Sequence, residues 1–388
     1  MNTREKFLSV LNSGNSSQVP EWEFAYWFDT LQNWYKEGLP RKNPPLRFDK
    51  QQWVAGEACP GADFFYGEEH YDRDVNEIFG FDERVRGVAV ELGPLPLFPE
   101  DIFEEDAENI IFRRGDGKVV KTRKDGGSMP HFIEYPVKTA EDFEIIKARF
   151  NAEDRFRFPD DWKVYSESYQ NRTFPLQLGG GNNCGFYSII REMAGVEESL
   201  FLFHDEPDFV WSMLEFFTDY YIKLYSKVLE NVQPDYILIW EDCAFNTGPL
   251  VSPAIFREFL LPFYKKFTNS MRVLGVEHFI VDTDGNFEAL IPLFIEGGVT
   301  GFYPFEVQAG MDIEKTRALY PELLIFGGID KKVLAGTKED MDMELAKVER
   351  MLKKGRYIPY TDHMVPPDVS FENYKYYRKR LKQIIKNN

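Results

Sequence analysis

The C-terminal part of the chain repeats one pattern five times. Each copy is an apolar, β-like run that stops at an acidic residue and is followed by a turn and a helix-like stretch. The runs are residues 235–244 (DYILIWEDCA), 277–286 (EHFIVDTDGN), 301–307 (GFYPFEV), 323–330 (LLIFGGID) and 356–368 (RYIPYTDHMVPPD). Nearly continuous apolar runs indicate parallel strands that are covered on both faces, so a charge at the carboxyl end needs a reason. Barrels and open α/β sheets place their chemistry at that edge.

The stretches between these runs indicate helices. Ser252 with Pro253, Thr337 with Asp340, and Ser370 are all typical of helix starts. An earlier run at residues 174–181 (FPLQLGGG) begins the same alternation of strand and helix. Connections of this length allow parallel pairing, either in a closed (β/α)8 barrel or in an open doubly wound sheet. We favour a TIM barrel that forms one domain over residues 1–388.

The N-terminal region has a different character. Residues from about 19 to 138 are rich in aromatic residues, proline and glycine, and residues 109–127 predict a β-hairpin that turns at Gly115-Asp116-Gly117. We therefore expect an elaborated N-terminal region, with residues from about 85 to 137 forming a β-rich insertion or a lid over the barrel mouth.

Composition excludes several classes of function. The net charge of −18 argues against nucleic acid, and no apolar run approaches the roughly 20 residues of a membrane span. Without a signal-peptide core, the chain is expected to be cytoplasmic. Cys59, Cys184 and Cys243 are too scattered for a disulfide framework. No GxGxxG or GxxxxGK motif follows a strand, so we expect no nucleotide cofactor. The sequence leaves a homodimer open.

The acidic strand ends supply the first candidate site residues. Glu241 and Asp242 follow one strand, and because adjacent residues face opposite ways, only one of them should enter a pocket. A carboxylate there could serve as a general acid or base. Glu306 and Asp330 occupy equivalent positions and are weaker candidates, while Gly180 allows a backbone to approach a ligand closely.

Aromatic residues make up 16% of the chain, and several gather near the N-terminus. Trp22 and Tyr26 could stack on a substrate or hold a methylammonium group by cation-π attraction, with Glu23 between them. Packing beneath a lid is the alternative interpretation of this cluster.

Five stretches together resemble the uroporphyrinogen decarboxylase superfamily, and they cover nearly the whole chain. They are residues 19–40 (VPEWEFAYWFDTLQNWYKEGLP), 240–267 (WEDCAFNTGPLVSPAIFREFLLPFYKKF), 281–307 (VDTDGNFEALIPLFIEGGVTGFYPFEV), 327–334 (GGIDKKVL) and 355–377 (GRYIPYTDHMVPPDVSFENYKYY). The resemblance implies a (β/α)8 barrel with its site at the C-terminal mouth. It also favours Asp242 over Glu241 as the inward residue. The superfamily includes decarboxylases and corrinoid-dependent methyltransferases.

The chain departs from the decarboxylases at their substrate clamp. Those enzymes carry an Arg-Gln-Ala-Gly-Arg run near the N-terminus that holds the carboxylates of the tetrapyrrole, and here the comparable residues 34–40 read WYKEGLP. A substrate with eight carboxylates would also meet the acidic strand ends, and like charges in a partly dry site repel. We therefore do not expect uroporphyrinogen to be the substrate.

The chain also departs from the methyltransferases, which hold zinc with a His-x-Cys and a later Cys. Here the His-x-Cys position reads Asp282-Thr283-Asp284-Gly285, and the position of the later Cys falls at or near Asp362-His363. Asp282 and Asp284 share one strand face, so together with His363 they could bind zinc, manganese or magnesium and leave a position open. A polar site without metal, or an ordinary turn capped by Asp284, are the alternatives.

Our first interpretation is methyl transfer between a small methylated donor and a corrinoid protein. The metal or carboxylate site would assist, with Asp242 moving a proton. The corrinoid would belong to a partner, because the chain has no Asp-x-His-x-x-Gly motif. The alternatives are a decarboxylase-like lyase that acts on a smaller substrate and a ligand-binding barrel without catalysis.

Overall fold

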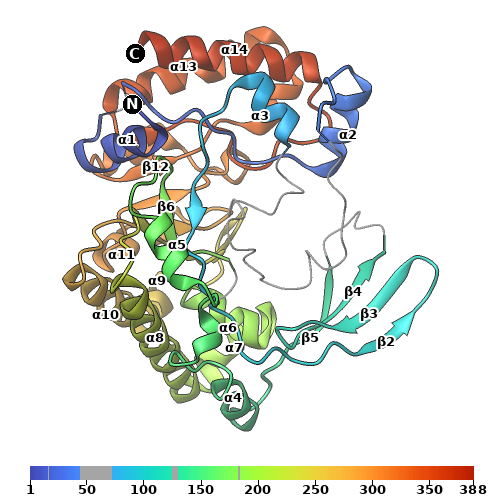
Figure 1. The fold of residues 1–388 in the computed structure, drawn as a ribbon, viewed down its shortest axis with the longest axis vertical. Helices are drawn as coiled ribbons and strands as arrows, with labels where there is room; N and C mark the ends of the chain where they lie inside the picture. The colour runs from blue at the N-terminus through green and yellow to red at the C-terminus, as the bar shows by residue number, and fades with distance from the viewer. Residues whose placement is uncertain (16, 44–71, 125–129, 182–183) are drawn as a thin grey trace.

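The computed structural model describes residues 1–388 except 16, 44–71, 125–129 and 182–183, so Cys59 lies outside the described residues. Its centre is a curled sheet of parallel strands in the order β1-β6-β7-β10-β11-β12-β13 (Figure 1). The strands are β1 (Arg86–Gly87), β6 (Leu176–Gly179), β7 (Tyr236–Trp240), β10 (Phe279–Asp282), β11 (Gly301–Tyr303), β12 (Leu324–Phe326) and β13 (Tyr357–Ile358). Each except β1 lies within a run that the sequence predicted. β1 falls at the start of the segment expected to form the β-rich insertion, but it pairs with β6 in the parallel sheet.

The register sets the carboxyl ends of the middle strands level with one another. Asp282, the last residue of β10, pairs with Trp240 of β7 on one side and with Tyr303 of β11 on the other. The residues that follow these three strands therefore emerge at one edge of the sheet. This is the edge where the acidic strand ends were expected to meet.

An extended N-terminal segment lies between the last strand and the first. Tyr26 forms an isolated parallel bridge with Val365, and the Asp82 amide donates to the Glu21 carbonyl (3.1 Å). In the part of the chain that the structure describes, the parallel sheet itself has seven strands. The predicted α/β class with a parallel sheet is confirmed, and the sheet is curled like part of a barrel.

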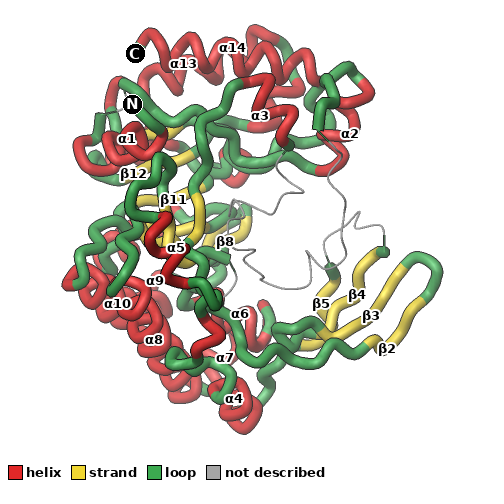
Figure 2. The backbone as a smooth tube through the Cα atoms, viewed as in Figure 1, coloured by secondary structure: helices red, strands yellow, loops and turns green. Residues whose placement is uncertain are grey.

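Helices surround the parallel strands (Figure 2). In the first half of the chain they are α1 (Thr3–Leu8), α2 (Phe28–Lys36), α3 (Arg73–Phe79), α4 (Ala140–Lys147), α5 (Trp162–Ser168), α6 (Tyr187–Ala194) and α7 (Val196–Asp205). In the second half they are α8 (Pro207–Leu229), α9 (Pro253–Ile255), α10 (Leu261–Val273), α11 (Ile291–Glu296), α12 (Ile313–Leu319), α13 (Lys338–Lys354) and α14 (Phe371–Asn387). No described helix is both long enough and apolar enough to cross a membrane.

The predicted helix starts are confirmed. Ser252 accepts from the Ile255 amide at the start of α9, and Ser370 accepts from Asn373 at the start of α14. Thr337 and Asp340 form a reciprocal capping box at the start of α13. These side chains satisfy amides that a helix leaves without partners. After Ser252, apolar residues recur at helical spacing and are buried: Phe256, Phe259, Leu260, Phe263, Phe267 and Met271.

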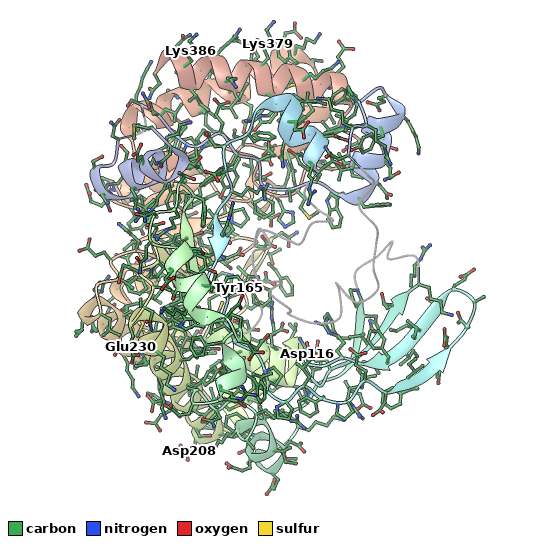
Figure 3. All side chains as sticks on the ribbon, viewed as in Figure 1. Asp116, Tyr165, Asp208, Glu230, Lys379 and Lys386 are labelled. Atoms are coloured by element: carbon green, nitrogen blue, oxygen red, sulfur yellow. The ribbon has the colours of Figure 1, made fainter. Side chains whose placement is uncertain are left out.

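A second, antiparallel sheet stands to one side of the parallel one, and contains β2 (Ile102–Glu105), β3 (Asn109–Arg113), β4 (Val119–Arg123) and β5 (His131–Glu134). β3 and β4 form the hairpin that the sequence predicted. Asp116, in the turn between them, lies at the end of this sheet that is nearer to α6 (Figure 3). A short third sheet joins β8 (Ala244–Phe245) to β9 (Gly248–Pro249) just after β7.

Candidate functional site

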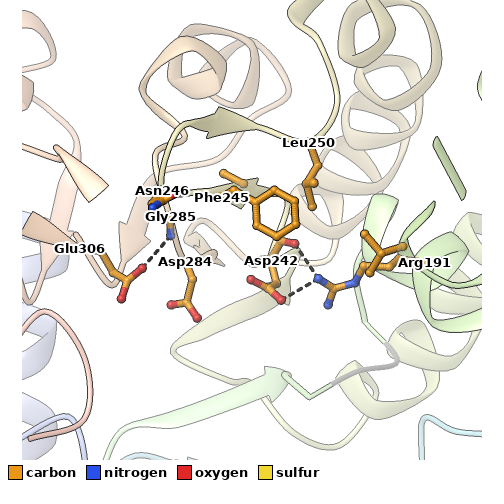
Figure 4. A pocket seen from close by; sticks show the side chains of 10 residues that line it. Arg191, Asp242, Phe245, Asn246, Leu250, Asp284, Gly285 and Glu306 are labelled. Atoms are coloured by element: carbon orange, nitrogen blue, oxygen red, sulfur yellow. Dashed lines mark hydrogen bonds and ion pairs between the residues drawn. The ribbon is translucent and has the colours of Figure 1, made fainter. Parts of the chain in front are cut away.

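A cavity of about 230 Å³ opens at the carboxyl ends of β7, β10 and β11 (Figure 4). Its wall combines charged and apolar side chains. The lining residues are Arg191, Val196, Asp242, Ala244, Phe245, Asn246, Leu250, Asp284, Gly285 and Glu306. Three of the predicted acidic residues, one after each of the three strands, are therefore brought to one cavity.

Asp242 occupies the centre of this wall in an unusual backbone conformation. Its φ of 43° lies in the left-handed region, which a side chain other than glycine rarely adopts. Arg191 of α6 donates to the Asp242 carboxylate (2.6 Å) and to its carbonyl (2.8 Å), and the guanidinium lies over the Trp240 ring. Burial raises the pKa of Asp242, and the negative charge of Asp284 adds to this rise, while Arg191 opposes it. The net direction is upward.

Glu241 points the other way, as the alternation along a strand predicts. Its buried carboxylate accepts from the amides of Phe186 (2.8 Å) and Ser188 (3.0 Å), and from the Tyr264 hydroxyl. Burial raises its pKa, and these donors lower it. Glu241 therefore does not line the cavity. Because it accepts from these amides, Glu241 holds in place the start of α6, the helix that carries Arg191.

The carboxylate of Asp284 faces the same space as that of Asp242 (Figure 4). One Asp284 oxygen lies 3.6 Å from His363 Nε2, and the other is buried with no hydrogen-bond partner among the residues that the structure describes. The His363 ring packs against Phe24, with 4.9 Å between ring centroids. Asp284 and His363, predicted from two distant segments, are thus neighbours.

Asp282 does not complete the predicted metal-binding set. Its side chain is buried and does not line the cavity, and burial, with the charge of Asp284 next, raises its pKa well above the usual range. Within the described ranges, no three His, Cys, Asp or Glu side chains are grouped so that they could hold a metal ion. Asp282, Asp284 and His363 therefore do not fit the three-ligand site that their spacing suggested.

Glu306 supports the turn that carries Asp284. Its carboxylate accepts from the Gly285 amide (3.0 Å) and from Lys331 Nζ (3.1 Å). Lys331 also lies 3.6 Å from the buried Asp362 carboxylate. Burial raises the pKa of Asp362 to about 6, although Lys331 and two backbone amides oppose the rise. Lys331, which follows β12, thus joins Glu306 at the end of β11 to Asp362 at the end of β13.

The other predicted substrate contacts lie elsewhere. Trp22 donates its indole N–H to the Glu83 carbonyl, and the Tyr26 hydroxyl meets that of Tyr374 at 2.8 Å. Glu23 is buried between them and bonds to protein groups. None of these three side chains reaches the cavity wall described above, so packing, the alternative interpretation of this cluster, describes their surroundings.

Gly180 and Asp330 also lie away from that wall. The Gly180 amide donates to the Leu238 carbonyl, with φ at +97°. The Asp330 carboxylate accepts from Gln308 and from the Lys332 amide. These contacts within the protein account for a glycine at position 180 and an aspartate at position 330.

Arg191, the one cation on the cavity wall among the described residues, was not predicted from the sequence. It lies in the segment YSIIREMA, where most of the residues are buried. An arginine within a helix that is buried almost all round needs a partner, and this was the available signal. Phe245 and Leu250 were not predicted because Phe245 lies in the short strand β8 and Leu250 directly follows β9, and this two-stranded turn after β7 has no periodic pattern.

The fold and the site together define a parallel α/β protein whose charged groups gather at the carboxyl ends of its strands, as in barrel enzymes. The family model for uroporphyrinogen decarboxylase (URO-D) matches residues 120–384, well over half of the chain. The chain therefore belongs to the URO-D family, whose members are generally enzymes, and the predicted resemblance is confirmed at this level. A search of curated proteins found no match.

Proposed function

We propose that this protein is a URO-D-superfamily methyltransferase that takes a methyl group from a small donor, with Asp242 supplying a proton to the departing atom. The observation that carries the proposal is a half-buried carboxyl group with a raised pKa on the wall of a cavity at the strand ends. Such a group stays protonated to higher pH than an exposed carboxyl, as a general acid requires.

In the proposed reaction, the bond between the methyl carbon and its oxygen breaks, and the electron pair stays with the oxygen. That oxygen takes the proton of Asp242. The methyl carbon bonds to a nucleophilic acceptor, which supplies the new electron pair. Family relationship suggests a reduced corrinoid as the acceptor, and it would be carried by a partner protein, since this chain lacks the Asp-x-His-x-x-Gly motif.

The size and charge of the cavity support a small donor. At about 230 Å³ it is below the usual range of sites for drug-sized ligands, and it is far too small for a tetrapyrrole. Phe245, Leu250 and Val196 offer apolar surface to a hydrocarbon group. Asp284 and Glu306 disfavour a substrate with several carboxylates, because like charges repel at short range.

A carboxy-lyase is the second candidate, and Arg191 favours it. A guanidinium on the cavity wall could orient the carboxylate of a small substrate. The carbon–carbon bond would break with loss of carbon dioxide, and the electron pair left on carbon would take the proton of Asp242. The same acid thus serves either reaction.

We also infer that residues 21–26 act as the eighth strand of a (β/α)8 barrel. The Tyr26 bridge to Val365 and the Asp82 contact with Glu21 support this closure from both sides. Glu23 supports it as well, because its carboxylate accepts from Thr361, three residues beyond β13.

The test is a panel of aryl methyl ethers, methylamines and small carboxylic acids, incubated with the purified protein and cob(I)alamin. Methyl transfer is read from the corrinoid absorbance spectrum, and decarboxylation from released carbon dioxide. Asp242→Asn should lower the rate by about 10²–10⁴-fold, the usual contribution of a general acid, while Asp242→Glu keeps part of the activity. Turnover that Asp242→Asn leaves unchanged would exclude the proposed role.

A further inference from the structure

The antiparallel sheet delivers a buried lysine to the helix that carries Arg191. Lys118, next to the start of β4, has a side chain only 3% exposed. Its ammonium group lies 3.1 Å from Asp116 and also donates to Glu192 of α6. A buried ammonium needs such partners, because removing its charge from water is costly. Lys118 thus ties the β3–β4 turn to α6.

The chain of charges continues from Glu192 into the cavity. Arg191 lies 3.7 Å from the Glu192 carboxylate through one terminal nitrogen. Its other terminal nitrogen lies 2.6 Å from the carboxylate of Asp242. Arg191 therefore stands between two carboxylates and makes the closer contact with Asp242. Glu192 contacts Lys118 as a second cation in addition to Arg191.

The segment directly after β5 is fixed to α6 and to the residue after it at further points. The Val137 amide donates to the Met193 carbonyl (3.0 Å). Gly195, directly after α6, packs so closely on Tyr135 that a Cβ there would lie 2.7 Å from the ring. These contacts hold the sheet and the helix in one register. Lys118 and Glu192 therefore stay next to each other, because the segments that carry them cannot move relative to each other without breaking these contacts.

The charges explain why Arg191 prefers Asp242. Glu192 and Asp242 compete for one guanidinium, and the interaction energy of each pair falls with distance. Lys118 offsets the charge of Glu192 and so weakens its attraction for Arg191. Without Lys118, Glu192 would keep Arg191 as its nearest described cation and would draw it away from Asp242.

We propose that Lys118 is a positioning residue: by neutralising Glu192 it directs Arg191 onto Asp242, and this makes the antiparallel sheet part of the site. The proposal rests on the proposed role of the Asp242 cavity. Its central geometric claim concerns the orientation of Arg191, which can be measured without any substrate.

The test uses Lys118→Met, the double variant Lys118→Met/Glu192→Gln, and Lys124→Met as a control. Lys124 forms an ion pair with Glu105 in the same sheet, away from α6. Lys118→Met should lower kcat/KM by about tenfold to a hundredfold, because the Asp242 carboxyl group that Arg191 holds would be misplaced by about 1 Å, and this loss of position should outweigh the weaker opposition of Arg191 to the raised pKa of Asp242. The double variant should regain most of this loss, because the competing charge is gone, and Lys124→Met should match the wild type.

Trp240 gives a second readout, since Arg191 lies 4.8 Å from its ring centroid. The fluorescence of Trp240, obtained by subtracting the spectrum of the matching Trp240→Phe protein, should change in Lys118→Met and return in the double variant. This measurement needs no substrate, so it separates a failure of the positioning proposal from a failure to find the reaction.

An unchanged Trp240 signal in Lys118→Met would overturn the proposal. A double variant as impaired as Lys118→Met would also overturn it, because the lysine would then act by packing and not by charge. If Lys118→Met does not fold, Lys118→Arg takes its place. That variant keeps the charge and should retain the wild-type Trp240 signal, whereas a changed signal would contradict the charge argument.

Discussion

Replacing Glu23 by alanine should destabilise the fold and leave substrate recognition intact. The sequence placed Glu23 among aromatic residues as a substrate contact, but its carboxylate is buried against protein groups. It accepts from the amide (2.9 Å) and hydroxyl (2.7 Å) of Thr361 and from the Tyr374 hydroxyl (3.1 Å), and it lies 3.4 Å from Arg378. These contacts join the N-terminal segment to the residues after β13 and to α14.

The magnitude follows from what the substitution leaves behind. Arg378 is buried, and removing one member of a buried ion pair costs about 3–5 kcal/mol, because the remaining charge lacks compensation. Arg378 keeps its bond to the Trp22 carbonyl and its place over the Phe81 ring, so we expect the lower half of that range. An unfolding entropy of about 2.1 cal/mol/K per residue gives about 0.8 kcal/mol/K for 388 residues. The Tm should therefore fall by about 4–5 °C.

The assay is equilibrium unfolding in urea, followed by circular dichroism and by calorimetry. Glu21→Ala is the matched control, since Glu21 lies 3.5 Å from the exposed Lys382 and such a surface pair is worth less than about 1 kcal/mol. Glu23→Leu/Arg378→Met should recover part of the loss, because no unpaired charge remains. A Glu23→Ala protein of wild-type stability with a raised KM would refute this reasoning and restore Glu23 as a substrate contact.

Three further predictions test the cavity and the residues around it. Gly285→Ala should cost about 1–3 kcal/mol in urea unfolding, because the added Cβ would lie 2.6 Å from the Ala244 carbonyl in a left-handed backbone conformation; wild-type stability would contradict this close approach of the turn to Ala244. Asp362 has a folded pKa of about 6, above its unfolded value near 4, so its contribution to stability is full below pH 4 and is lost as pH rises through 6. Asp362→Asn should remove this dependence, worth up to about 3 kcal/mol, from a pH series of unfolding curves, and an unchanged series would show that the folded pKa is not raised. Elemental analysis should find no zinc, manganese or magnesium that is present in the wild type and lost in Asp284→Ala. A stoichiometric metal that behaves in this way would support the predicted site with His363.

The strands and the helix starts could be predicted because their causes are local. A strand such as β10 needs a continuous apolar run when both of its faces are covered, and that run is visible in the sequence. The caps of α9, α13 and α14 follow from one hydroxyl and the amides three positions later. Level strand ends then follow from parallel pairing, and this brought Asp242, Asp284 and Glu306 to one edge.

The partners of these side chains could not be predicted, because they come from distant parts of the chain. Arg191 reaches Asp242 from a helix whose start depends on Glu241, and Glu23 reaches Arg378 across 355 residues. Composition places aromatic side chains near the N-terminus but cannot say whether they face a ligand or α14. In the structure, the Tyr26 ring packs edge-on against Tyr374 of α14, with 5.7 Å between ring centroids.

Two acidic strand ends that look alike in sequence differ in their backbone conformation and partners, and the difference supports the role that we propose for Asp242. Asp330 has an ordinary φ of −61° and accepts from the Lys332 amide, so it serves as the cap of a short helical turn. Asp242 is held at a φ of 43° while its amide donates to the Asp282 carbonyl, and Arg191 grips both its carbonyl and its carboxylate. A left-handed conformation costs a side-chain-bearing residue about 1–3 kcal/mol and persists when surrounding contacts impose it. No capping role requires that cost at Asp242, and its effect is to turn the carboxylate toward the cavity.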